Sequence, residues 1–127
     1  MRVCTKVWLE DEEGKLLLGD GRLKILSAID RAGSLSAAAR EIGMSYRAAW
    51  GKIRATEKRL GASLVEGVAG GAGHGGATLT PVARKLLLQF EAFHEEAIQA
   101  VELLARKRIG DLLGTDWRTR PRKGQGD

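Results

Sequence analysis

The chain has 127 residues, of which 43% are hydrophobic and 29% are charged, and its formal net charge is +5. This balance is ordinary for a globular domain and argues against a wholly disordered chain. No apolar run approaches the ~20 residues of a membrane-spanning helix, and the N-terminus lacks the apolar core of a secretory signal. The single cysteine, Cys4, cannot form an internal disulfide, and no Cys/His cluster has zinc-ligand spacing. We therefore expect a cytoplasmic protein with no metal, no cofactor and no membrane partner.

Positive charge is concentrated in two parts of the chain. Residues 22–65 carry nine basic and three acidic side chains, and residues 105–127 carry seven basic and three acidic ones. Residues 1–21 and 66–104 are net acidic. A central basic block of this kind is typical of a domain that binds a polyanion such as nucleic acid.

The first 21 residues predict a β-hairpin that caps the domain. One face of its first strand would carry the alternating side chains of Val3, Thr5, Val7 and Leu9. A polar turn over residues 11–15 contains a glycine, and three leucines at 16–18 supply the second strand.

The next segment predicts three helices, over about residues 21–31, 35–42 and 46–60. Ser34 and Ser45 are candidate N-caps, while Gly43 and Gly61 would end the second and third helices. A short helix, a turn containing glycine and a longer capped helix have the spacing of a helix-turn-helix. Helical hairpins of other kinds share this spacing, so the charge pattern is needed to separate the two interpretations.

The third predicted helix has a core face and a basic face. The core face would carry Ala49, Ile53, Thr56 and Leu60. The opposite face would carry Arg47, Gly51, Arg54 and Lys58, which is the composition that a helix needs to meet phosphates and base edges in the major groove. Gly51 costs about 1 kcal/mol of helix propensity relative to alanine, and close approach to DNA would compensate for that cost. A solvated basic face is the alternative interpretation.

Two aromatic residues, Tyr46 and Trp50, lie one helical turn apart at the edge between these faces. Packing at the rim of the core is one interpretation of this pair. Contact with sugars, phosphates or a thymine methyl group is the other.

Residues 64–80 predict a wing of two short strands. Residues 64–66 and 78–80 are extended in character, and residues 67–77 between them contain six glycines. We expect this loop to follow the edge of a DNA groove, with Gly73, His74 and Gly75 near the sugar-phosphate backbone. A nucleotide-binding loop would need Gly-Lys-Ser/Thr followed by a helix, and a strand pattern follows here instead.

A long helix is predicted from Pro81, capped by Thr80, to about Arg108. Its apolar residues recur every three or four positions in the manner of a heptad seam, and we expect them to form a dimer interface: Leu86, Phe90, Phe93, Ala97, Val101 and Leu104. Packing of this helix on its own domain is the alternative.

The predicted architecture is mainly α with small β elements. It comprises a hairpin (1–21), a winged helix-turn-helix (22–80), a dimerisation helix (81–109) and a flexible basic tail (110–127). The tail would add non-specific phosphate contacts or solubility.

Several motifs together resemble the N-terminal DNA-binding domain of the molybdate-responsive ModE regulators, whose helix-turn-helix is related to that of LysR-type regulators. The resemblance covers about residues 3–105 and rests on residues 34–39 (SLSAAA), 43–50 (GMSYRAAW), 64–66 (LVE), the glycine loop 70–76 and 79–80 (LT). It implies a winged helix-turn-helix that dimerises through its long helix and binds a palindromic operator.

The chain departs from this family at the wing and at its C-terminal end. Gly67 stands where the family usually has arginine, and Ala72 and His74 stand where lysine or glycine is common, so one phosphate contact at the wing is not carried over. ModE continues into two molybdate-binding domains, for which the 17 residues after Gly110 leave no room. We therefore expect a stand-alone DNA-binding version and carry over no molybdate or tungstate sensing.

The sequence thus predicts a homodimeric, sequence-specific regulator of transcription that binds double-stranded DNA, with an unidentified effector protein or ligand as a further partner. The major-groove residues would be Arg47, Trp50, Gly51 and Arg54. The residues expected at the DNA backbone are Ser36, Ser45, Tyr46, Lys52 and Lys58. An oxyanion-responsive protein and a non-specific architectural protein are the alternatives. An enzyme is not expected, because Cys4, His74 and His94 form no nucleophile–base arrangement.

Overall fold

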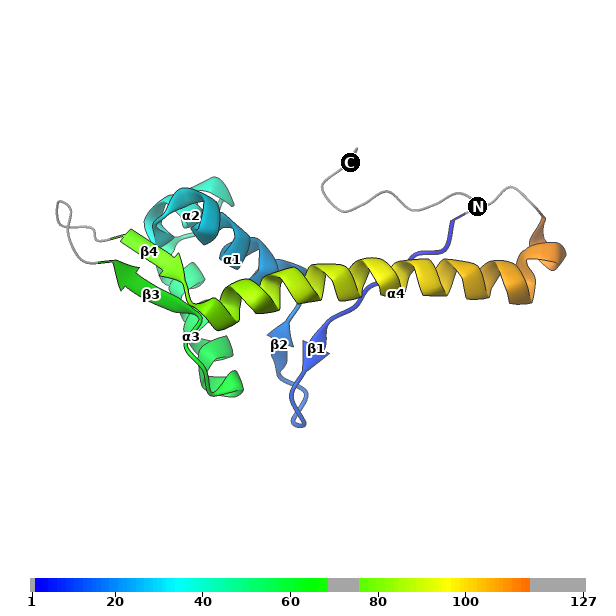
Figure 1. Cartoon of the computed structure of the whole chain (residues 1–127), viewed down its shortest axis with the longest axis horizontal. Coiled ribbons are helices and arrows are strands. Elements are labelled where there is room, and N and C mark those ends of the chain that lie inside the picture. Colours follow the sequence, from blue (N-terminus) through cyan, green and yellow to red (C-terminus); the bar gives the residue numbers. More distant parts are fainter. Residues whose placement is uncertain (1, 69–75, 115–127) are drawn as a thin grey trace. The chain divides into compact units, whose positions relative to one another are not determined.

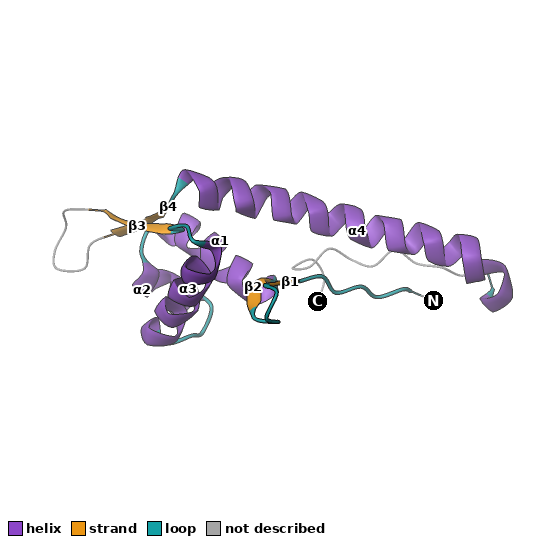
Figure 2. Cartoon of the chain, turned by 90° about the horizontal axis from the view of Figure 1, so that it is seen from below, coloured by secondary structure: helices purple, strands orange, loops and turns teal. Residues whose placement is uncertain are grey.

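The computed structural model describes residues 2–68 and 76–114 (Figure 1). Its helices and strands follow in the order β1 (Leu9–Glu10), β2 (Leu16–Leu18), α1 (Asp20–Ala32), α2 (Leu35–Glu41), α3 (Tyr46–Leu60), β3 (Val65–Val68), β4 (Gly76–Leu79) and α4 (Pro81–Leu113). The predicted class, mainly α with small β elements, is confirmed (Figure 2). The chain divides into two compact units, one over Trp8–Leu88 and the other formed by residues before and after that span.

The helix ends within Trp8–Leu88 follow from local chemistry. The hydroxyl oxygens of Ser34 and Ser45 accept hydrogen bonds from the backbone N–H groups of Ala37 and Ala48, both at 3.1 Å, which caps α2 and α3 as predicted. α3 ends at Gly61, whose φ of 70° lies in the left-handed region that glycine adopts without a steric cost.

The core of this unit is formed by α1, α2, α3, the first turns of α4 and the base of the wing. α1 contributes Ile25, Leu26 and Ile29, none of which is exposed to solvent, and Ile53 joins them from α3. The alanines at 38 and 39 are buried on α2, and their small side chains let α1 pack closely against it. Met44, which follows the turn after α2, packs against this core.

The wing is joined to the helices by backbone hydrogen bonds. β3 and β4 pair antiparallel, with Val65 opposite Leu79 and Val68 opposite Gly76. The N–H of Ala77 donates to the carbonyl oxygen of Gly33 at 2.8 Å, which attaches β4 to the end of α1. The wing therefore has a fixed base on the helix-turn-helix.

The N-terminal hairpin is shorter than predicted. β1 contains only Leu9 and Glu10, and residues 3–7 lie outside any strand, although a first strand over 3–9 was expected. The cause is the partner strand: β2 has three residues, and α1 begins two residues later. A ladder cannot extend beyond the partner that supplies its hydrogen bonds.

The helices α3 and α4 each differ from the prediction in one respect. Leu60 was assigned to the core face of α3 but is 37% exposed, and Glu57 takes the inner position instead. α4 continues through Gly110 to Leu113, beyond the predicted end near Arg108. A single glycine costs a helix only about 1 kcal/mol, so it weakens the helix without ending it. The rest of the predicted basic tail, from residue 115, lies outside the described residues.

Candidate nucleic-acid interface

The basic face predicted for α3 is present in the structure. Arg47, Gly51, Arg54 and Lys58 are all exposed. Along the helix they span about 16 Å, at 1.5 Å per residue. A Cβ atom built on Gly51 would have no neighbour within 4 Å, so this position leaves an open gap in the stripe of basic side chains.

The charge on α3 is directed outward. The helix carries five basic residues and one acidic residue, Glu57, whose side chain is only 8% exposed. The charged side chains that α3 presents to solvent are therefore all cationic, which favours a polyanionic partner.

The two aromatic residues lie in different environments. Trp50 is half-buried and packs against the core, whereas Tyr46 is 54% exposed in the first turn of α3. The Trp50 ring also lies 4.1 Å from the guanidinium carbon of Arg54. Trp50 thus contacts the core, and a cation of the basic stripe lies over its ring.

The other residues predicted at the DNA backbone differ in their exposure to solvent and in their contacts. Ser36 is exposed on α2, and Ser45 is exposed at the start of α3, where its oxygen already serves as the N-cap. Lys52 is half-buried. The predicted wing contacts Gly73, His74 and Gly75 lie outside the described residues.

Glu57 is a structural residue of this site that the sequence reasoning missed. Its Oε2 accepts hydrogen bonds from the backbone N–H groups of Leu64 at 2.7 Å and Val65 at 3.2 Å, and its Oε1 pairs with Arg54 at 3.1 Å. The available signal was its spacing, because Glu57 follows Ile53 by four positions and so falls on the buried face. A carboxylate on a core face requires partners, and here the start of the wing supplies them.

A second cationic group lies at the junction of α1 and α3. The Nε of Arg22 donates to the hydroxyl of the buried Thr56 at 3.1 Å. Burial lowers the pKa of Arg22, and the charge of Arg59 lowers it further. Arg59 itself donates to the carbonyl oxygen of Leu16 at 2.6 Å, which fastens the N-terminal hairpin to α3. An arginine stays charged despite such a shift, so both groups add to the positive potential of this helix.

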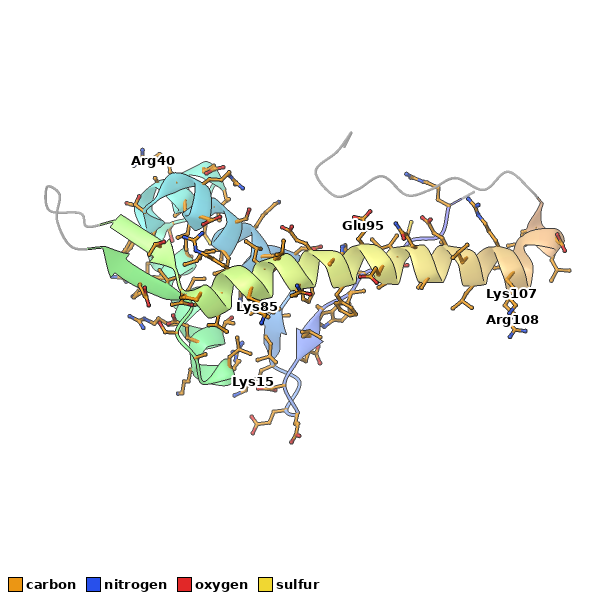
Figure 3. The ribbon with its side chains drawn as sticks, in the orientation of Figure 1. Lys15, Arg40, Lys85, Glu95, Lys107 and Arg108 are labelled. Carbon is orange, nitrogen blue, oxygen red and sulfur yellow. The ribbon has the colours of Figure 1, made fainter. Side chains whose placement is uncertain are left out.

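The residues of the predicted dimer seam on α4 differ in their exposure to solvent. Leu86 packs against the core of its own chain, and Phe90 is buried with its ring edge-on to that of Phe93. Phe93 and Leu104 are exposed, whereas Ala97 and Val101 are half-buried. Lys107 and Arg108 project from the later turns of the helix (Figure 3).

The described part of the chain has neither a metal-binding cluster nor a membrane-spanning helix. Over residues 2–68 and 76–114, no group of three or more His, Cys, Asp or Glu side chains is arranged to hold a metal ion. No helix in this part of the chain is long and apolar enough to cross a bilayer. Cys4 is exposed and not in a disulfide, and His94 is half-buried on α4.

The fold and the basic α3 face define a winged helix-turn-helix. Residues 21–84 match the family described as "Bacterial regulatory helix-turn-helix protein, lysR family", and the chain belongs to that family. The chain is 47% identical over 75 residues to the molybdenum-pterin-binding protein MopB of Rhodobacter capsulatus, which covers 59% of this chain and 28% of MopB. It is 32% identical over 91 residues to the DNA-binding transcriptional dual regulator ModE of Escherichia coli K12, covering 72% of this chain and 35% of ModE.

A solved structure shares the fold. Full-length CbnR complexed with its target DNA superimposes with a TM-score of 0.51 at 24% identity, over 68% of this chain and 28% of that one. This chain spans little more than a third, or less, of the length of each of these three relatives.

Proposed function

We propose that this chain is a sequence-specific regulator of transcription that binds double-stranded DNA as a homodimer in the cytoplasm. The observation that carries this proposal is the exposed face of α3, with five basic side chains on the helix and its one acid turned inward. The similarity to a relative named as a DNA-binding transcriptional regulator supports it.

In the proposed complex α3 lies in the major groove. Arg47 and Arg54 are the residues able to form paired hydrogen bonds with a guanine, because a guanidinium presents its donors in a planar fork. Gly51 between them lets the helix backbone come close to the bases. The hydroxyl hydrogen of Ser45 remains available to a phosphate, since only the oxygen is used in capping.

The dimer in this proposal forms through α4. Phe93 and Leu104 belong to the predicted seam, and both expose large apolar side chains. A two-fold dimer would place two α3 helices in successive major grooves, about 34 Å apart, and would read an inverted repeat.

The test is selection of bound fragments from genomic DNA at about 150 mM salt, a concentration that suppresses purely electrostatic binding. The expected result is an enriched inverted repeat, and the double variant Arg47→Ala/Arg54→Ala should not enrich it. Binding without enrichment that vanishes as salt rises would leave a non-specific architectural protein instead.

A second candidate function comes from the similarity to MopB, whose name states molybdenum-pterin binding. Titration calorimetry with molybdate at high protein concentration tests it directly. Heat that saturates at one site per chain or per dimer would support an oxyanion-responsive protein, and no heat would reject tight binding.

A further inference from the structure

One arginine of the basic face is held from two sides. The guanidinium of Arg54 lies over the ring of Trp50, at 4.1 Å from its centroid, and its Nη1 lies 3.1 Å from Oε1 of Glu57. The side chain of Arg54 is nevertheless 60% exposed. A guanidinium has five N–H donors, so most of them stay available to an outside acceptor.

Both partners of Arg54 are themselves fixed. Trp50 packs against the hydrophobic core. Glu57 is almost fully buried, and its Oε2 is held by the N–H groups of Leu64 and Val65 where β3 begins. The carboxylate therefore links α3 to the start of the wing, and it cannot move without breaking its hydrogen bonds with the backbone of Leu64 and Val65.

Arg47 offers the opposite case on the same helix. Within the described residues the side chain of Arg47 takes part in no ion pair, hydrogen bond or ring contact. A long cation of this kind loses rotamer freedom when it docks, and this loss of entropy weakens binding. Arg54 has already lost much of that freedom before any partner arrives.

We infer that Glu57 and Trp50 are positioning residues for Arg54, and that Glu57 ties the DNA contact of Arg54 to the start of the wing. This inference rests on the proposed function, since it names how one residue of that site is oriented. In this arrangement Trp50 supports Arg54, which contacts the bases, and does not contact the bases itself.

The first test is a double-mutant cycle on binding to the selected operator duplex. Glu57→Gln keeps the shape of the side chain and an oxygen for the wing N–H groups but removes the ion pair. We expect it to weaken binding about five- to tenfold when Arg54 is present and less than twofold in an Arg54→Met background. Equal weakening in both backgrounds would show that Glu57 acts on wing structure alone, and would overturn the inference.

Arg47 supplies the matched control for this cycle. Because Arg47 does not contact Glu57, the double variant should raise the dissociation constant by the product of the two single fold-changes, from Arg47→Ala and from Glu57→Gln. Coupling as strong as that between Glu57 and Arg54 would mean a general change in the helix, and would also overturn the inference.

A measurement on the free protein separates this inference from the proposed function. In the wild-type NMR spectrum the side-chain protons of Arg54 should be shifted upfield by the Trp50 ring. That shift should be kept in Trp50→Phe and lost in Trp50→Leu. Unshifted Arg54 signals in the wild type would overturn the inference even if DNA binds. A wild type that has shifted signals but binds no duplex would instead remove the proposed function, and with it the DNA role of Glu57.

Discussion

The two ends of the folded chain use apolar residues in opposite ways. Over Trp8–Leu88 the core side chains Ile25 on α1 and Ile53 on α3 are enclosed, each at most 1% exposed. On α4 after residue 88, Leu103 is 67% exposed, Leu104 55% and Leu112 81%. The first region is stabilised by a core of its own, whereas the exposed apolar side chains of α4 are those that the proposed dimer would cover. The difference teaches that apolar residues at helical spacing do not by themselves reveal whether a helix face is enclosed by its own chain or left exposed.

The largest expected effect is on folding. Ile53→Ala should lower the free energy of unfolding by roughly 2–5 kcal/mol, because it leaves a cavity between α1 and α3. Urea denaturation at low protein concentration measures this loss. Leu103→Ala is the matched control from α4 and should change the same quantity by less than about 0.5 kcal/mol. If both variants lost a similar amount of unfolding free energy, the proposed difference between the enclosed core and the exposed α4 residues would be wrong.

Removal of one cation from the basic face should weaken operator binding. If Arg47 reads a guanine, Arg47→Ala costs roughly 1–3 kcal/mol of binding free energy and relaxes one base position. Fluorescence anisotropy with operator and scrambled duplexes measures both quantities. Lys107→Ala, which removes a cation from α4, should leave the base preference unchanged, because any contribution it makes to binding is electrostatic and the same for every sequence. An unchanged base preference in Arg47→Ala would exclude that residue from readout.

The association surface is tested by truncation of a seam residue. Leu104→Ala should raise the dissociation constant of the dimer about tenfold, since a two-fold interface loses two leucines for each substitution. Sedimentation equilibrium over a range of concentrations measures the constant. The exposed polar residue Gln99 provides the control, and Gln99→Ala should leave the constant within about twofold. A wild type that stays monomeric would contradict the dimer proposal itself.

The cap of α3 should matter more for stability than an exposed serine on α2. Ser45→Ala removes the acceptor for the Ala48 N–H and should cost about 1 kcal/mol of unfolding free energy. Ser36→Ala, at an exposed position within α2, should cost less than about 0.5 kcal/mol. Thermal unfolding followed by circular dichroism ranks the two, and a reversed order would mean that the cap is dispensable.

The smallest effect concerns pH and the N-terminal hairpin. The backbone N–H of Lys15 donates to the Asp11 carboxylate and lowers its pKa, and the N–H of Glu13 and the charge of Arg59 act in the same direction. A lowered pKa means that the folded state favours ionised Asp11. Its contribution is present above the ordinary Asp pKa of about 4 and is lost as pH falls through the lower folded value. Wild type should therefore exceed Asp11→Asn in stability at pH 6 by a margin that shrinks at pH 3. A margin that stays constant between pH 6 and pH 3 would mean that the folded state does not favour the ionised form of Asp11.

Local chemistry in the sequence by itself determined most of the helix-turn-helix. The caps Ser34 and Ser45, the left-handed glycines after α2 and α3 and the apolar spacing of α3 act over a few residues, so their effects can be predicted without knowing the fold. The basic stripe from Arg47 to Lys58 is likewise a property of helical periodicity. For this reason the observed bounds of α3, Tyr46–Leu60, coincide with the predicted ones.

Only the tertiary structure decided the length of the hairpin, the orientation of Glu57 and the environment of Trp50. Strand length depends on a partner strand, and the short β2 limits β1. Glu57 is turned inward because its carboxylate accepts hydrogen bonds from the backbone N–H groups of Leu64 and Val65. These residues lie seven and eight positions after Glu57, so they come into contact with it only after the chain turns at the end of α3. The sequence shows which groups need a partner, whereas which partner each one finds depends on how the chain folds back on itself.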